Sequence, residues 1–206
     1  MEKIIQVATR YSVAMLLLLF CSVHIVHAQG NDIKWLRSIH RSSGSRAMEG
    51  VSMSNYIVAM ALPAGQLIYG YAADDSISKQ NAWQTAAGLA LTTGITYALK
   101  YSIQRERPFE TYPDIKPSRL EDGYSIPSGH ASLAFSMATS VSLQYKKWYV
   151  VAPAFLYAGL VSYSRLHLGV HYPSDVLVGA AVGTGSAWLC YKGQQWLFKR
   201  KQNKSR

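Results

Sequence analysis

Six long stretches of this sequence contain no charged side chain. An uncharged, mostly apolar run of about 20 residues is typical of a helix that crosses a membrane, because an ionised group is costly in the hydrocarbon layer. The first three runs reach that length alone, the fourth reaches it when its motif end is counted, and the last two need neighbouring residues. The runs are 11–31, 50–73, 80–99, 123–145, 148–164 and 176–191.

The fold class follows from these runs. The sequence shows no alternating strand pattern of useful length and no internal repeat, so helices are expected throughout. A chain of 206 residues is long enough for one domain with a real core. We therefore predict an all-α fold, a polytopic membrane helix bundle with about six transmembrane helices. For the runs 148–164 and 176–191, core helices of a soluble protein remain the alternative.

The N-terminal run determines whether the bundle has six transmembrane helices or five. Lys3 and Arg10 precede the apolar stretch, and a Val-His-Ala sequence follows it at 26–28, which is the arrangement of a cleavable signal peptide. A retained first transmembrane helix fits the same residues, and both interpretations place the chain that follows outside the cytoplasm. The predicted divisions are 1–28, a signal peptide or first transmembrane helix; 29–192, the functional domain; and 193–206, a basic cytoplasmic tail.

The formal net charge of +10 comes from residues that lie between the apolar runs, an arrangement that argues against a nucleic-acid partner. The basic tail and the Lys146–Lys147 pair are typical of cytoplasmic segments beside anionic lipid. Counting crossings from the inside then places 29–52, 101–126 and 165–174 outside. Basic residues gather at these outer segments against the usual rule, which suggests that they bind an anion. They are Lys100, Arg105, Arg107, Lys116, Arg119 and Arg165.

The first of three motifs lies at the outer end of the third run. Six residues separate Lys100 from Arg107, and Pro108 follows directly. Seven positions correspond to two helical turns, so we predict that both basic side chains lie on one helical face and contact one phosphate from two sides. Pro108 is expected to end that helix. Taken alone, the pair also fits basic residues that anchor a membrane helix at the interface.

The second motif, Pro127-Ser128-Gly129-His130, leads directly into the apolar part of the fourth run. Proline suits the first turn of a helix, and glycine lets a substrate approach the backbone, so free amide groups here can point at an anion. Ser128 adds a hydroxyl, and His130 is expected at the rim, where a leaving oxygen needs a proton. A simple helix cap is the alternative interpretation.

The third motif is Ser164-Arg165, five residues, His171, three residues and Asp175. Pro173 lies between the last two, which suggests a turn into the final helix with the carboxylate close to the imidazole. An aspartate that accepts a hydrogen bond from one ring nitrogen fixes the tautomer and leaves the other nitrogen free to attack phosphorus. Arg165 adds a bidentate contact to the transferring oxygens. A structural hydrogen bond within the His-Asp pair is the alternative.

Together, in this order and each at the outer end of an apolar run, the motifs resemble the signature of the type 2 phosphatidic acid phosphatase superfamily over roughly residues 50–192. The resemblance implies that His171 is the nucleophile, that Asp175 orients it and that His130 is the general acid. It implies neither a metal nor another cofactor. It also implies phosphate binding by Lys100, Arg107, Ser128, Gly129 and Arg165.

The resemblance and the topology together imply a phosphatase for a lipid phosphate monoester or pyrophosphate. It would act through a phosphohistidine at the outer, periplasmic face of a bacterial inner membrane. The expected partners are the lipid phosphate and the membrane, with no nucleic acid and no obligate protein partner. The sequence leaves the oligomeric state open, and it leaves open whether the substrate is an isoprenoid pyrophosphate, phosphatidylglycerophosphate, phosphatidic acid or a lipid A phosphate.

Other functions remain open at this stage. A soluble periplasmic non-specific acid phosphatase would use the same site in a domain without membrane helices. Vanadium haloperoxidases share the motifs, but the chain length and the apolar runs argue against one. A catalytically silent membrane protein that binds or transports lipid phosphate would keep the phosphate ligands, although here every catalytic position is also intact.

Overall fold

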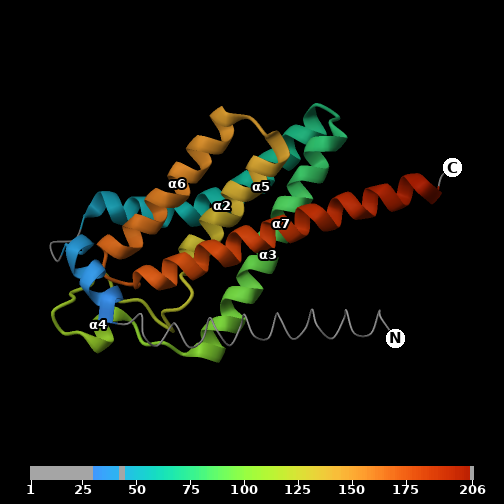
Figure 1. Ribbon diagram of the computed structural model, residues 1–206. Helices are drawn as coiled ribbons and strands as arrows, with labels where there is room; N and C mark the ends of the chain where they lie inside the picture. The colour runs from blue at the N-terminus through green and yellow to red at the C-terminus, as the bar shows by residue number, and fades with distance from the viewer. Residues whose placement is uncertain (1–29, 42–44, 205–206) are drawn as a thin grey trace, which may run out of the picture.

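The computed structural model describes residues 30–41 and 45–204, with side chains through residue 197. Within these ranges every regular element is a helix, which confirms the all-α prediction, and all but the last two residues of the first uncharged run lie outside them. A helix covers residues 30–39. The elements labelled in Figure 1 are α2 (Arg46–Ala72), α3 (Ser76–Ile103), α4 (Pro108–Thr111), α5 (Gly129–Tyr145), α6 (Trp148–His167) and α7 (Pro173–Lys204).

Each uncharged run within the described ranges lies largely in one long helix, and polar or charged residues mark the helix ends. Asp75 caps the start of α3, because its carboxylate accepts hydrogen bonds from two backbone amides of the first turn. Gln104 and Lys146 adopt left-handed backbone conformations, with φ of 53° and 51°, and end α3 and α5. The segment 193–204, expected as a tail, continues α7 beyond the bundle (Figure 1).

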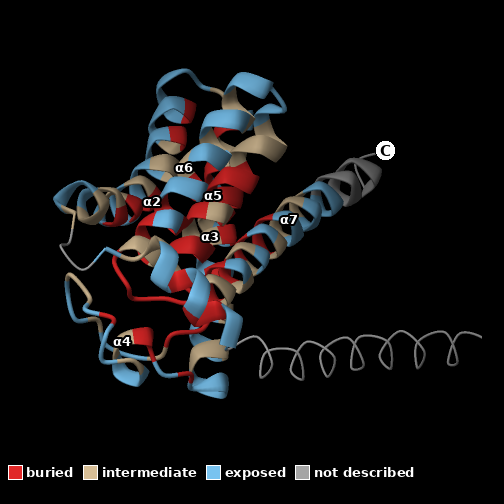
Figure 2. Ribbon diagram, turned by 60° about the vertical axis from the view of Figure 1, so that its left-hand side comes forward, coloured by how far each residue is buried: buried red, intermediate tan, exposed pale blue. Residues whose placement is uncertain are grey.

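The central helix of the bundle is α5, which contacts α2, α3, α6 and α7. Its buried residues are mostly alanine, serine and threonine, and small side chains let neighbouring helices approach closely. Figure 2 shows buried residues concentrated on α5 and on the adjoining faces of its neighbours. The first residues of α5, which carry the second motif, therefore belong to the helix that the other long helices surround.

The long helices turn polar side chains inward and large apolar side chains outward. The buried residues of α3 are all small or polar, whereas Trp83, Tyr97 and Tyr101 on the same helix are mostly exposed. Water would disfavour this arrangement, but lipid solvates apolar side chains, and inward polar groups can pair between helices. Gln144, for example, donates to the hydroxyl of Thr85 at 2.9 Å. The distribution is that of helices surrounded by lipid.

This arrangement lowers the average hydropathy of the helices. Of the helices within the described ranges, α2 alone is long and apolar enough to cross a membrane on length and composition. The polar residues of α3 and α5 face other helices, so the helix average understates how apolar the outer surface is. The uncharged runs located the long helices because the inward polar residues, although they lower the mean hydropathy, carry no charge.

The helix ends that carry the motifs meet at one end of the bundle (Figure 1). They are the end of α3, the start of α5, the end of α6 and the start of α7. The irregular segment 112–128 and the helix of residues 30–39 lie over this end, so both are in place to shape a site there. The buried apolar cluster that joins them consists of Ile33, Leu36, Ile115 and Tyr172.

α7 approaches α5 closely at two glycines. A Cβ on Gly179 would lie 2.7 Å from the carbonyl oxygen of Ser128, and one on Gly183 would overlap the carbonyl oxygen of Ser132. Gly183→Ala is therefore expected to destabilise the protein by about 3 kcal/mol. Thermal unfolding in detergent measures the effect. Gly185→Ala, at a glycine with open space around it, is the control, and equal stability of the two variants would contradict the close approach.

Candidate active site

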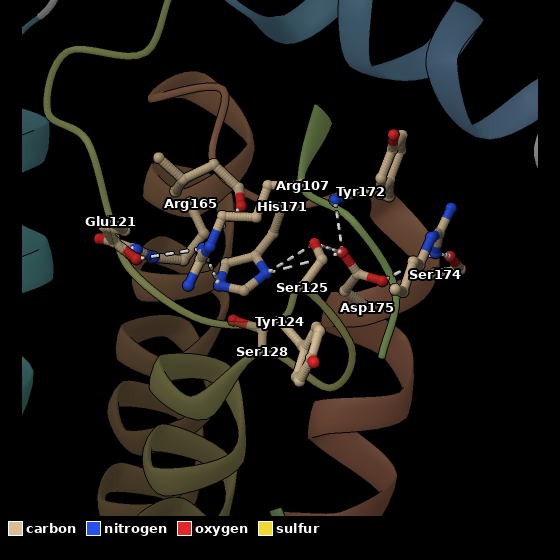
Figure 3. A network of polar contacts seen from close by, with 12 residues as sticks. Arg107, Glu121, Tyr124, Ser125, Ser128, Arg165, His171, Tyr172, Ser174 and Asp175 are labelled. Atoms are coloured by element: carbon tan, nitrogen blue, oxygen red, sulfur yellow. Dashed lines mark hydrogen bonds and ion pairs between the residues drawn. The ribbon is translucent and has the colours of Figure 1, made fainter. Parts of the chain in front are cut away.

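The three motifs meet at the end of the bundle where α3 and α6 end and α5 and α7 begin. Arg107, Arg165, His171 and Asp175 are each at most 4% exposed. Arg107 Nη1 lies 3.5 Å from His171 Nε2. In Figure 3 the imidazole lies between the carboxylate of Asp175 on one side and that of Glu121, with its arginine partners, on the other. The structure thus brings together basic and acidic groups that are far apart in the sequence.

Lys100 and Arg107 reach the site from different elements. α3 ends at Ile103, so Lys100 lies in its last turn, whereas Arg107 lies beyond the helix. The prediction that both side chains share one helical face is wrong, because the left-handed conformation of Gln104 ends the helix before Arg107. Pro108 begins α4 and does not itself end α3.

Both basic side chains are fixed by backbone oxygens of neighbouring segments. Lys100 Nζ donates to the carbonyl of Tyr124. The guanidinium of Arg107 makes three such hydrogen bonds, so its position is preorganised and an anion that binds it causes little rearrangement. Its acceptors are the carbonyls of Gly123 at 2.8 Å, Asp122 at 3.0 Å and Val170 at 3.0 Å.

The second motif forms the start of α5. Ser128 is the N-cap residue and Gly129 begins the helix, so Pro127 lies before the cap and not in the first turn. The Ser128 hydroxyl is buried, makes no cap hydrogen bond and has no partner within the protein. Amides in the first turn of a helix bind anions readily. These amides and the Ser128 hydroxyl can therefore contact oxygens of a bound phosphate.

His130 lies in the first turn of α5, and its side chain is buried. Its ring packs edge-on against Tyr56 of α2, with ring centroids 4.6 Å apart. Its carbonyl accepts a hydrogen bond from Asn55 Nδ2 at 3.1 Å. α2 therefore covers His130, which is why the side chain has little contact with solvent.

His171 lies in the turn between α6 and α7, and its surroundings favour the neutral imidazole. Burial lowers the pKa of His171 well below its ordinary value, and the positive charges of Arg165, Arg107 and Lys100 lower it further. A neutral imidazole keeps a lone pair for attack. Because Nε2 is the nitrogen near Arg107, it is the one that faces the basic side of the site.

Asp175 lies on the Nδ1 side of the ring. Its Oδ2 is 3.6 Å from His171 Nδ1, close but longer than the hydrogen bond expected from the sequence. The same oxygen accepts from Ser125 Oγ at 2.5 Å and from the amide of Tyr172 at 2.8 Å. The carboxylate is thus held beside Nδ1 by groups that the motifs do not include.

Glu121 occupies the space between the two motif arginines. Its Oε2 is 3.2 Å from Arg107 Nη1, and its Oε1 accepts a hydrogen bond from Arg165 Nη2. Burial alone would raise the pKa of Glu121, but the charge of Arg165 and its hydrogen bond contribute to lowering it to about 2. The carboxylate is therefore ionised at ordinary pH and contacts both guanidinium groups, which are the groups that a phosphate would bind.

Several residues of the site were not found from the sequence. They come from α2 and from the segments around the motifs, and they support motif residues through contacts between distant parts of the chain. The signal available for those on α2 was the presence of polar side chains within an uncharged run, where such groups are costly unless paired. The set comprises Asp32, Ser52, Asn55, Tyr56, Glu121 and Ser125. Arg105, which the sequence grouped with the anion-binding residues, instead forms ion pairs with Asp32 and Asp175.

The arrangement suits a dianionic, tetrahedral group. Arg107 and Arg165 both contact Glu121, and Arg165 Nε and Ser128 Oγ are buried polar atoms without partners in the protein. Leaving such atoms unpaired is costly, and phosphate oxygens would pair with them. In the part of the chain that the structure describes, no group of three or more His, Cys, Asp or Glu residues is placed to hold a metal.

Comparisons with known proteins show the family of the chain. The sequence profile of the PAP2 superfamily matches residues 81–199. The lipid A 4'-phosphatase of Bacteroides thetaiotaomicron is 35% identical over 86 residues, which cover 42% of this chain and 38% of that protein. The undecaprenyl-diphosphatase of Sulfolobus acidocaldarius is 36% identical over 94 residues, which cover 44% of each protein. The matches therefore span less than half the length of these relatives.

A solved structure extends the likeness to most of the chain. The transmembrane PAP2-type phosphatidylglycerolphosphate phosphatase of Bacillus subtilis has a TM-score of 0.69, with 22% sequence identity. The superposition covers 87% of this chain and 92% of that one. Identity at this level shows the fold alone; that protein is a transmembrane one, and the outward-facing apolar side chains of the present chain are consistent with the same surroundings. The predicted polytopic membrane helix bundle is thereby confirmed.

Proposed function

Because the chain belongs to the PAP2 superfamily, we propose that it is a lipid phosphatase that works through a phosphohistidine at His171. The observation that carries this proposal is the orientation of the imidazole. Nε2 is 3.5 Å from Arg107, on the cationic side, while Nδ1 faces the buried carboxylate of Asp175. A neutral histidine held this way can attack a phosphate bound by the arginines.

The proposed reaction has two steps. In the first, His171 Nε2 forms a bond to phosphorus while the bond to the leaving oxygen breaks, and His130 donates a proton to that oxygen. Asp175 stabilises the positive charge that develops on the ring. In the second, water attacks phosphorus, His130, now without its proton, accepts a proton from that water, and the bond to His171 Nε2 breaks to release inorganic phosphate. Covalent transfer divides one difficult hydrolysis into two easier steps.

The phosphate ligands in this proposal are Lys100, Arg107, Arg165, the Ser128 hydroxyl and the backbone at Gly129. Their role is to neutralise the charge on the phosphate oxygens as the bond breaks. Fixed donors act most strongly in a site with little water, and the arginines and Ser128 are buried. The proposed catalysis therefore relies on side chains and backbone amides and does not require a metal.

A lipid substrate is supported by the position of the site. It lies at one end of a bundle whose outer surface carries exposed apolar side chains. Two of the relatives are named as phosphatases of lipid A and of an isoprenoid diphosphate. We place the site at the periplasmic face of a bacterial inner membrane, because Lys146, Lys147 and the basic end of α7 lie toward the opposite end.

The direct test is phosphate release by purified protein from a panel of lipid phosphates. The panel contains phosphatidic acid, phosphatidylglycerophosphate, an isoprenoid pyrophosphate and a lipid A phosphate, each in detergent with EDTA present. Release that is sensitive to vanadate is expected for at least one of them. Binding of these lipids without turnover would instead favour a silent lipid-phosphate binder.

A second measurement separates the membrane enzyme from a soluble acid phosphatase. Membranes from cells that express the protein are washed with alkaline carbonate, which removes peripheral proteins. The chain is expected to stay in the membrane pellet. Recovery of active protein in the aqueous fraction would contradict the membrane assignment.

Glu121 is expected to compete with the phosphate of the substrate. Glu121→Gln removes the competing charge and should lower KM about tenfold, the effect of one ion pair worth about 1.4 kcal/mol. Since the pKa of Glu121 is about 2, the carboxylate is ionised throughout the range from about pH 5 to pH 8, and the difference in KM should be constant over it.

Kinetics at several pH values measure this effect, with Glu106→Gln as the control. Glu106 is a nearby exposed carboxylate. Its Oε2 accepts a hydrogen bond from the hydroxyl of Thr111, and the side chain contacts neither Arg107 nor Arg165 in the structure. An unchanged or higher KM in Glu121→Gln would show that this carboxylate supports the arginines and does not compete with phosphate. The ion pairs of Glu121 stabilise the fold above the ordinary carboxyl pKa, and this contribution is lost as the pH falls toward 2.

A further inference from the structure

A second set of charges lies behind Asp175, on the side away from the imidazole. Arg105 Nη1 is 2.7 Å from Asp175 Oδ1, and Arg105 Nη2 is 3.0 Å from Asp32 Oδ2. All three side chains are at most 9% exposed. Arg105 therefore joins two buried carboxylates, one of which adjoins His171.

The guanidinium of Arg105 is held in a fixed plane. It stacks over the ring of Tyr172, with Cζ 3.8 Å from the ring centroid. Nη1 also donates to Ser174 Oγ at 2.6 Å. A planar guanidinium held on its face and at its edges has little freedom, so it can determine the orientation of a carboxylate that it contacts.

Asp32 fixes the start of the helix that carries Asp175. Its Oδ1 accepts a hydrogen bond from the amide of Ser174 at 3.1 Å, and its Oδ2 accepts one from the Ser174 hydroxyl. That amide belongs to the first turn of α7, where backbone donors have no partner within the helix. Asp32 thus acts as a cap supplied by the helix of residues 30–39.

These contacts leave Asp175 one orientation. Arg105 binds Oδ1, while Ser125 and the amide of Tyr172 bind Oδ2, the oxygen nearest His171. Rotation of the carboxylate would break all three hydrogen bonds. A buried carboxylate without such partners would be strongly disfavoured. The cation that compensates the charge of Asp175 is thus also the group that orients it.

We propose that Asp32 and Arg105 are positioning residues for the reaction, which hold Asp175 so that it orients His171. Asp32 lies outside the part of the chain that matches the superfamily profile, which begins at residue 81. The helix of residues 30–39 would then contribute to catalysis through the contact between Asp32 and Arg105, which are 73 residues apart in the sequence. This inference rests on the proposed phosphohistidine mechanism.

The test compares Asp32→Asn and Arg105→Lys with the wild-type protein in detergent, using the best substrate of the lipid phosphate panel. Each variant is expected to lower kcat about 10- to 100-fold, because a small misplacement of a catalytic group has effects of that size. KM should stay within about twofold of the wild-type value, because neither residue contacts the phosphate position.

Arg37→Ala provides a matched control. Arg37 also joins the helix of residues 30–39 to the loop that covers the site, through an ion pair with Asp114 at 2.8 Å, but both side chains are about half exposed. Its kcat and KM are expected to equal those of the wild-type protein. The melting temperature of each variant shows whether a loss of kcat follows from a loss of folded protein.

The outcomes separate the two proposals. No turnover by the wild-type protein on any lipid phosphate overturns the proposed function and this inference with it. Turnover by the wild type together with a normal kcat in Asp32→Asn overturns the inference alone. A fall in kcat that Arg37→Ala shares, or that comes with an equal rise in KM, also overturns it, because a general structural role would produce that pattern. If Arg105→Lys fails to fold, the isosteric Asp32→Asn decides.

Discussion

Replacing His171 with alanine is expected to reduce phosphate release by about 10⁴-fold or more, as the loss of a nucleophile does in other covalent mechanisms. The side chain is almost fully buried between the arginines and Asp175. Removing it leaves the phosphate ligands in place but no group to attack phosphorus. Substrate binding should therefore persist while turnover is lost.

Initial rates of phosphate release measure this effect, and vanadate or inorganic phosphate binding confirms that the site remains formed. His167→Ala is the matched control, since this histidine ends α6 four residues earlier and its ring lies against Tyr163, with ring centroids 6.0 Å apart. It should retain a rate within a few-fold of the wild-type protein. A His171→Ala variant with more than about 1% of the wild-type rate would exclude His171 as the nucleophile.

Asp175→Asn is expected to reduce the rate by about 10⁴-fold, comparable to the loss of the orienting aspartate in a serine protease triad. Asparagine keeps the shape of the side chain but removes the charge that stabilises the imidazolium. It also leaves Arg105 with one carboxylate in place of two. The loss of activity should thus appear chiefly in kcat. The variant should also unfold at a lower temperature, because Arg105 loses one of its two ion pairs.

Circular dichroism and thermal unfolding of Asp175→Asn show whether the fold is intact. Ser125→Ala is a graded comparison, because it removes one hydrogen bond to Asp175 and keeps the charge. It should lower kcat less than Asp175→Asn does. Equal rates for Asp175→Asn and the wild-type protein would mean that His171 needs no orienting carboxylate.

Much of the architecture could be predicted because charge and helix formation are local properties. The uncharged runs from residue 50 onward coincide with the long helices, and the third motif correctly predicted a turn into the last one, which Pro173 begins. Mean hydropathy is a poorer guide for this chain, because polar side chains face inward and the apolar surface faces outward.

The error at Lys100 and Arg107 has a specific cause. Counting seven residues as two helical turns assumes that the helix continues, but Gln104 adopts a left-handed conformation and the chain turns. No glycine or proline marks this position in the sequence. The basic residues still reach one site, because the loop that follows returns the guanidinium to it.

The supporting residues could not be predicted for a different reason. Asp32, Glu121 and Ser125 contact the motif residues only after separate segments have folded against one another. A single sequence holds no periodic or spacing signal for such pairs. The three motifs led to the proposal of which groups react, whereas the structure shows which groups hold them in place.

The most direct test of the central claim is to trap the intermediate. Purified protein is mixed with a lipid phosphate labelled with radioactive phosphorus, quenched within one turnover and digested into peptides. A label that is labile in acid and stable in alkali, carried by the peptide that contains His171 and absent from His171→Ala, is the predicted result. Turnover without any labelled protein under these conditions, or a label on a serine or another histidine, would contradict the account.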